Sequence, residues 1–112
     1  MSDKKAWPMM ANRTQGLRAV GGTLDVVEGE LRFTPNALDA LTGGKALAVP
    51  LTRVTAVGSE PGRVALGELF SGGLRTRLAI ELDDGTRELF VVWSVPVAIE
   101  AVRTALEATA PR

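Results

Sequence analysis

The fold is decided by the stretch VGGTLDVVEGELRFTP, residues 20–35, which predicts a β-hairpin. Its two alternating runs are joined by Glu28-Gly29. A two-residue loop there makes apolar residues face each other and opposite charges face each other, in the pairs Val26–Leu31, Leu24–Phe33 and Asp25–Arg32. A slip by one residue would turn Val26 toward Glu30, so we expect the two-residue loop.

A second hairpin is predicted over residues 74–93, with its turn at Asp84-Gly85. A two-residue loop would give the cross-strand pairs Ile80–Leu89, Leu78–Val91 and Ala79–Phe90. Because Phe90 would then lie on the outer side, both faces of this hairpin are apolar. We therefore expect another element to cover its outer face.

An amphipathic helix is predicted from Val95 to about Ala108, with Ser94 as N-cap and Pro96 in the first turn. Its apolar stripe consists of Val95, Ala98, Ile99, Val102, Ala105 and Leu106. Charged residues lie on the opposite side. We expect this helix to cover the outer face of the second hairpin.

The rest of the chain is divided by glycine and proline. Before the first hairpin we expect a strand over 12–20 and a turn at Gly21-Gly22. After it we expect a loop over 36–45 with one helical turn capped by Asn36, and then a strand over 46–57 that bends near Pro50. A surface turn over 58–62, a short strand over 63–66 and a loop over 67–74 should follow. Pro50 suits an edge strand because it cannot donate to a neighbouring strand.

The chain resembles a GRAM domain, a member of the pleckstrin-homology (PH) superfold, over about residues 11–107. The resemblance depends on three apolar patterns: G-x-L-x-V-x-x-x-x-L-x-F from Gly22 to Phe33 followed by Pro35-Asn36, V-P-L-x-x-V-x-x-V from Val49 to Val57, and D-G-x-x-x-x-F-V from Asp84 to Val91. It implies a mainly β, PH-like roll of two near-orthogonal antiparallel sheets, with about seven strands, capped by one C-terminal α-helix. The polar signature of the family's first hairpin turn is absent, since Val27, Glu28 and Glu30 take those places.

The length of 112 residues predicts a single domain, which we place at residues 12–109 after a flexible arm at residues 1–11. Cysteine is absent, and neither a signal-peptide-like run nor an apolar stretch of about 20 residues is present. We expect a cytoplasmic protein, with a peripheral membrane location as the alternative.

Catalysis is not expected. The sequence lacks histidine, cysteine and tyrosine, which excludes Ser-His-Asp and Cys-His schemes and histidine-ligated metals. Asp83 and Asp84 are adjacent but belong to a solvated hairpin tip, so no metal site is expected there. We predict no catalytic residue, no metal and no cofactor.

Charge and aromatic residues bear on the partners. The 13 basic and 13 acidic residues balance, and most of the five aromatic residues fall at predicted core positions, so no nucleic acid is expected. PH-like phosphoinositide binders use basic residues on the first two strands, and the resemblance places Arg13 and Arg18 there. Trp7 and Phe70 are candidates for apolar contact, although each also fits a role in covering the core.

The sequence thus favours a non-enzymatic, intracellular, PH-like binding module that mediates protein–protein interaction. The alternative is a peripheral membrane adaptor that binds anionic lipid headgroups through Arg13 and Arg18. Balanced charge and missing catalytic residues fit both hypotheses, and the sequence leaves open whether the protein is a monomer or a homodimer.

Overall fold

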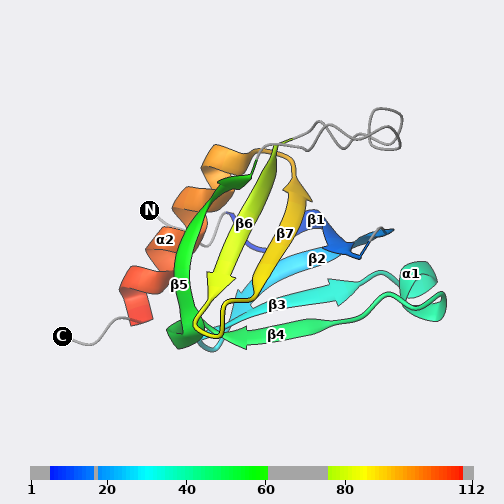
Figure 1. Ribbon diagram of the computed structural model, residues 1–112, viewed down its shortest axis with the longest axis horizontal. Coiled ribbons are helices and arrows are strands. Elements are labelled where there is room, and N and C mark those ends of the chain that lie inside the picture. The colour runs from blue at the N-terminus through cyan, green and yellow to red at the C-terminus, as the bar shows by residue number, and fades with distance from the viewer. Residues whose placement is uncertain (1–5, 17, 61–75, 110–112) are drawn as a thin grey trace.

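Figure 1 shows the computed structural model, which describes residues 6–16, 18–60 and 76–109. Its described elements are seven strands, two α-helices and one 3-10 helix. In chain order they are β1 (Met9–Gln15), β2 (Arg18–Val27), β3 (Glu30–Pro35), α1 (Ala37–Leu41), β4 (Leu47–Pro50), η2 (Leu51–Arg53), β5 (Val54–Glu60), β6 (Arg77–Leu82), β7 (Arg87–Val92) and α2 (Val95–Thr109).

The seven strands form one antiparallel sheet with the order β4-β3-β2-β1-β7-β6-β5. Figure 1 shows that this sheet curls, so that β5, β6 and β7 run across the direction of β3 and β4 while α2 lies along one side of the roll. The predicted mainly β roll of about seven antiparallel strands with one C-terminal helix is therefore confirmed, and its strands form a single curled sheet where two sheets were predicted.

The first hairpin has the predicted register. Leu24 pairs with Phe33, Asp25 with Arg32 and Val26 with Leu31. Both loop residues adopt left-handed backbone conformations, with φ of 51° at Glu28 and 80° at Gly29. Two positive φ angles are typical of a type I′ turn, whose twist matches that of the strands that it joins.

The second hairpin differs from the prediction by one residue. Leu78 pairs with Phe90 and Ala79 with Leu89, because the loop has three residues, Asp83 to Gly85, with Gly85 left-handed at φ 88°. The Leu82 N–H donates to the Thr86 carbonyl (2.9 Å) and the Gly85 N–H to the Leu82 carbonyl (3.0 Å), which closes this loop. A shift of one residue moves each side chain of the return strand to the other face of the sheet.

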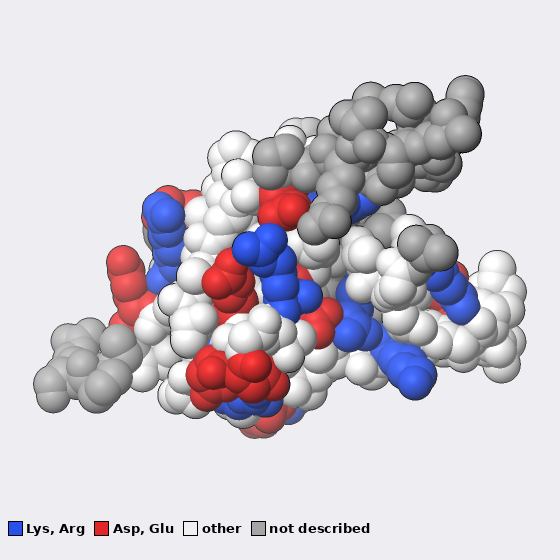
Figure 2. Space-filling model, viewed as in Figure 1, with Lys and Arg blue, Asp and Glu red and all other residues white. Residues whose placement is uncertain are grey.

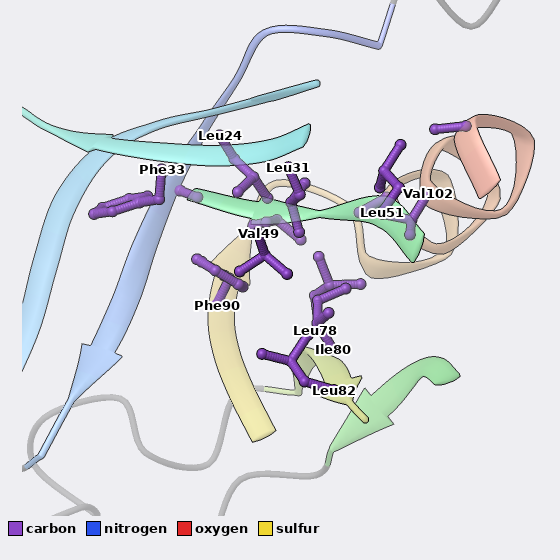
Figure 3. Packing of buried hydrophobic residues seen from close by; sticks show 14 of the residues in the cluster. Leu24, Leu31, Phe33, Val49, Leu51, Leu78, Ile80, Leu82, Phe90 and Val102 are labelled. Carbon is purple, nitrogen blue, oxygen red and sulfur yellow. The ribbon is translucent and has the colours of Figure 1, made fainter. Parts of the chain in front are cut away.

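The inner face of the sheet and the stripe of α2 share one hydrophobic core (Figure 3). Its most buried large side chains are Phe33, Phe90, Leu24, Leu31, Leu51, Leu78, Ile80, Val20 and Val102. The rings of Phe33 and Phe90 lie with their centroids 5.8 Å apart. The expectation that α2 covers an outer face bearing Phe90 is wrong, because Phe90 points inward and α2 packs on the inner side.

Residues 12–20 form two strands instead of the single predicted strand. Gln15 pairs with Arg18, so the chain reverses there, and Gly21-Gly22 lies inside β2 instead of forming a turn. The glycines are needed for close approach: a Cβ on Gly22 would lie 2.2 Å from the Thr34 carbonyl oxygen.

The other predicted segments agree with the structure only in part. The Asn36 side chain caps α1 by accepting a hydrogen bond from the Asp39 N–H (2.9 Å), and Pro50 ends the edge strand β4. The predicted turn over 58–62 begins inside β5, while the short strand over 63–66 and the loop over 67–74 lie outside the described residues. In the described part of the chain no helix is long and apolar enough to cross a membrane.

Candidate functional site

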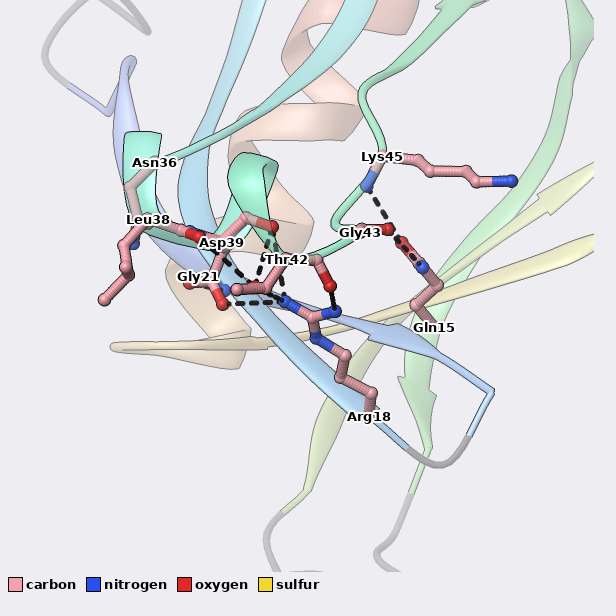
Figure 4. Close-up of polar contacts among 9 residues, drawn as sticks. All are labelled: Gln15, Arg18, Gly21, Asn36, Leu38, Asp39, Thr42, Gly43 and Lys45. Atoms are coloured by element: carbon pink, nitrogen blue, oxygen red, sulfur yellow. Dashed lines mark hydrogen bonds and ion pairs between the residues drawn. The ribbon is translucent and has the colours of Figure 1, made fainter.

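One end of the inner face is closed by polar contacts (Figure 4). Arg18 of β2 reaches α1 and its C-cap residue, and donates to the Asp39 carbonyl (3.2 Å), the Asp39 carboxylate (3.2 Å) and the Thr42 hydroxyl (2.6 Å). It also donates to the Thr42 carbonyl. Next to it, Gln15 donates to the Gly43 carbonyl and accepts from the Lys45 N–H, each at 3.0 Å.

Arg13 of β1 lies deeper in the same end of the roll. It alternates with the buried Ala11 and pairs with Phe90, so its side chain points to the inner face. Arg13 Nε donates to Glu88 Oε1 at 3.0 Å, and the two side chains are only 14% and 12% exposed. Arg13 also donates to the Lys45 carbonyl (3.3 Å). We call the set Arg13, Gln15, Arg18, Asp39, Thr42 and Glu88 the polar clamp.

The structure therefore brings together both arginines that were predicted to bind a headgroup, and it gives each of them partners within the chain. Arg18 is the more exposed of the two, with 35% of its side chain accessible. Figure 2 shows positive and negative side chains interspersed over the viewed face, so the described residues of that face carry no extended field of one sign. Headgroup binding by Arg13 and Arg18 stays a prediction.

Of the two residues predicted for apolar contact, the structure describes only Trp7. Trp7 is half-buried and packs against the core cluster, which agrees with the role of covering the core. Phe70 lies outside the described residues.

A groove on the outer face was missed by the sequence analysis. It has a volume of about 380 Å³ and lies over β1, between β2 and β7. The side chains and backbone that form it include Met10, Asn12, Gly21, Thr23, Asn36 and Trp93. We call it the outer-face groove.

Two large apolar side chains stand at the rim of the outer-face groove. Trp93 is 95% exposed and Met10 is 83% exposed. Met10 lies just before the paired residue Ala11, and Trp93 directly follows Val92, the last residue of β7, so both border the groove from neighbouring strands. Trp93 also borders a second hollow, formed with the first turns of α2.

Two carboxamides converge at the floor of the groove. A Cβ on Gly21 would lie 3.1 Å from Asn12 Oδ1, 3.1 Å from Asn36 Nδ2 and 3.2 Å from Asp39 Oδ2. Glycine at this position therefore leaves room for both amides. The backbone beneath them is fixed, since the Gly21 N–H donates to Asp39 Oδ2 (3.1 Å) and its carbonyl accepts from the Asn36 N–H (2.9 Å).

Trp93 escaped the sequence analysis because of the register of the second hairpin. With a two-residue loop, Leu89, Val91 and Trp93 would all point into the core. The three-residue loop instead places Phe90 and Val92 in the core, so Val91 and Trp93 face outward. A tryptophan directly before the helix-capping Ser94 was the available signal, since its place outside the strand leaves it without cross-strand cover.

Comparisons with known proteins leave the family open. No protein-family model matches the sequence, and no curated protein matches it significantly. Among solved structures, the chain is similar to the pleckstrin homology (PH) domain of USP37, at 17% identity and a TM-score of 0.49, over 90% of this chain and 91% of that chain. Values this low transfer neither ligand nor partner, and GRAM membership stays a prediction.

The arrangement is suited to binding. Within residues 6–16, 18–60 and 76–109, no three acidic side chains are grouped so that they would hold a metal ion. The carboxylate whose pKa is lowered, Asp84, is held by Thr86 and then by Arg53 at an exposed hairpin tip. The outer-face groove, in contrast, combines exposed apolar side chains with amides and a hydroxyl, which are groups that bind by contact and hydrogen bonding.

Proposed function

We propose that this protein is a non-enzymatic, intracellular binding module of the GRAM type, and that a protein partner docks on the outer-face groove. The observation that carries the proposal is Trp93, 95% exposed beside Met10 at 83%. Exposing an indole and a thioether side by side leaves apolar surface in water that a partner would cover. Tryptophan is also among the residues that contribute most to protein interfaces.

The position of the groove supports the same function. Met10 belongs to β1 and Trp93 directly follows β7, and these two strands are hydrogen-bonded neighbours in the middle of the sheet. The backbone of these paired strands is in place before a partner binds, which lowers the entropy that binding costs. A partner would therefore meet a preformed surface.

Truncation of the rim tests the proposal. The immobilised wild-type protein, Trp93→Ala and Leu41→Ala are compared as baits in a lysate, and each captured protein is then purified and titrated against all three by calorimetry. Leu41 is 84% exposed on α1 and does not border the groove, so its variant is the matched control. We expect at least one partner that binds the wild type and Leu41→Ala about 30-fold more tightly than Trp93→Ala.

Two results would contradict the proposal. One is that every captured protein binds Trp93→Ala as tightly as the wild type. The other is sedimentation of the protein with anionic vesicles in a manner that Arg13→Ala with Arg18→Ala abolishes and Trp93→Ala does not. The second result would favour the membrane-adaptor alternative, in which lipid headgroups are bound at the polar clamp.

A further inference from the structure

The outer-face groove lies in the interior of the sheet. Beneath it, β1 pairs with β2 along Met9–Gln15 and with β7 at Ala11, Asn12 and Arg13. From Ala11 to Arg13 the backbone groups of β1 are therefore taken on both sides, and a ligand cannot add a strand to this part of β1. The backbone groups of a peptide in this groove must instead find side-chain partners.

The lining of the groove fits an uncharged ligand. None of the residues that form it is Asp, Glu, Lys or Arg, and the Asp39 carboxylate near its floor is paired with Arg18 and with the Gly21 N–H. Its polar groups are the amides of Asn12 and Asn36, the Thr23 hydroxyl and the Trp93 indole, which together offer several donors and two kinds of acceptor. Phosphate and carboxylate ligands would lack a counter-charge in this lining, whereas neutral peptide carbonyls match its donors.

Among peptide conformations, polyproline II fits these groups best. Its backbone has no internal hydrogen bonds, so its carbonyls are available to the Trp93 Nε1–H and to the Asn12 and Asn36 amides. Proline rings present flat apolar surface to an exposed indole, and the stiff chain loses little entropy on binding. An α-helix satisfies its own backbone and would leave the amides of the groove covered without partners.

We propose that the outer-face groove binds a proline-rich, uncharged segment of a partner protein in the polyproline II conformation. The inference rests on the proposed function and adds the chemical class of the ligand. Trp93 and Met10 hold a proline ring at the rim, while the Asn12 and Asn36 amides donate to carbonyls of the segment.

The test is a titration of the ¹⁵N-labelled full chain with decaproline that has blocked ends, followed by the side-chain resonances of tryptophan and asparagine. The matched control ligand is a blocked peptide of alternating glycine and serine with the same length and charge. We expect decaproline, but not the control peptide, to shift the Trp93 indole and the Asn12 amide signals. Trp93→Ala should weaken the binding about 30-fold, and Leu41→Ala should leave it unchanged.

Three results would overturn the inference: no shift at any concentration to which decaproline dissolves, equal shifts with both peptides, or shifts that map away from the groove. The lysate experiment distinguishes these from failure of the proposed function. A purified partner that needs Trp93 while decaproline does not bind would retain protein docking and exclude the polyproline ligand. Because Trp93 is almost fully exposed, Trp93→Ala is expected to melt at the wild-type temperature, and this is measured first.

Discussion

Leu78 and Phe90 face each other across β6 and β7, and this pair sets which side chains enter the core. Both are fully buried. If the register were shifted by one residue, as a two-residue loop requires, Val91 would face Leu78 in place of Phe90 and the aromatic ring would lie outside.

Alanine substitutions in β7 report on this register. Phe90→Ala removes a ring that contacts Phe33 in the core, so we expect it to lower the free energy of unfolding by about 3–5 kcal/mol. Leu89 is half-buried on the outer face, and we expect Leu89→Ala to cost about 1 kcal/mol. Urea unfolding followed by circular dichroism measures both. A larger loss for Leu89→Ala than for Phe90→Ala would contradict the register.

The two hairpins explain how much of the fold follows from the sequence. In the first, only one register matches apolar residues on one face and charges on the other, so the pattern alone decides it. In the second, the return strand reads Leu89, Phe90, Val91, Val92, Trp93, which is apolar at every position. Alternation is therefore uninformative there, and the loop conformation decides which residues are buried.

The outer-face groove could not be predicted from the sequence because its rim depends on the register of the second hairpin. Its apolar rim follows from which way Trp93 points, and that in turn follows from the three-residue loop at Asp83–Gly85. Its floor depends on Gly21, whose neighbours Asn12 and Asn36 are distant in the sequence. The sequence identified Arg13 and Arg18 by position, but their partners Glu88 and Asp39 are set by tertiary contacts.

Gly22 should tolerate no side chain. A Cβ there would lie 2.2 Å from the Thr34 carbonyl oxygen and 2.8 Å from the Pro35 Cα, and backbone atoms cannot move aside cheaply. We expect Gly22→Ala to cost about 3 kcal/mol in unfolding free energy. Gly58→Ala is the control, because no heavy atom lies within 4 Å of its Cβ. Equal thermal melts of the two variants would contradict this packing.

The turn of the first hairpin offers a stabilising substitution. Glu28 has φ 51°, a conformation that disfavours most side chains, whereas asparagine adopts it readily. We expect Glu28→Asn to raise the unfolding free energy by about 0.5–1 kcal/mol. Glu28→Ala removes the same charge without relieving the backbone and should give no such gain. If Glu28→Ala stabilises the protein as much as Glu28→Asn, the gain comes from the charge and the prediction fails.

The interaction free energy between Arg13 and Glu88 should be large because little solvent reaches their ion pair. Either Arg13→Leu or Glu88→Leu leaves one buried charge without a partner, and we expect each to cost about 3 kcal/mol. In the double variant both charges are gone, so most of the loss should return. A double-mutant cycle in urea measures this coupling. Additive losses would show that the two side chains act independently.

Asp84 should make the free energy of unfolding depend on pH in the acidic range. The Thr86 hydroxyl and N–H, followed by Arg53, stabilise its carboxylate and lower its pKa below the usual 3.8. A lowered pKa in the folded state adds stability that is complete above the unfolded pKa and is lost as the pH falls through the folded pKa. We therefore expect Asp84→Asn to be less stable than the wild type at neutral pH, and this difference to shrink below about pH 4.

Thr86→Val separates the hydroxyl from the other two groups that lower the pKa of Asp84, the Thr86 N–H and Arg53. It removes the hydroxyl and keeps the N–H, which lies 2.9 Å from Asp84 Oδ1, and it keeps Arg53, whose Nη2 lies 3.0 Å from Asp84 Oδ2. Its acid dependence should lie between those of the wild type and Asp84→Asn, because the pKa of Asp84 rises only part of the way toward its unfolded value. Urea unfolding at a series of pH values, with an NMR titration of the Asp84 carboxyl carbon, measures both quantities. A constant difference between wild type and Asp84→Asn at every pH would mean that the carboxylate gains nothing from its partners in the fold.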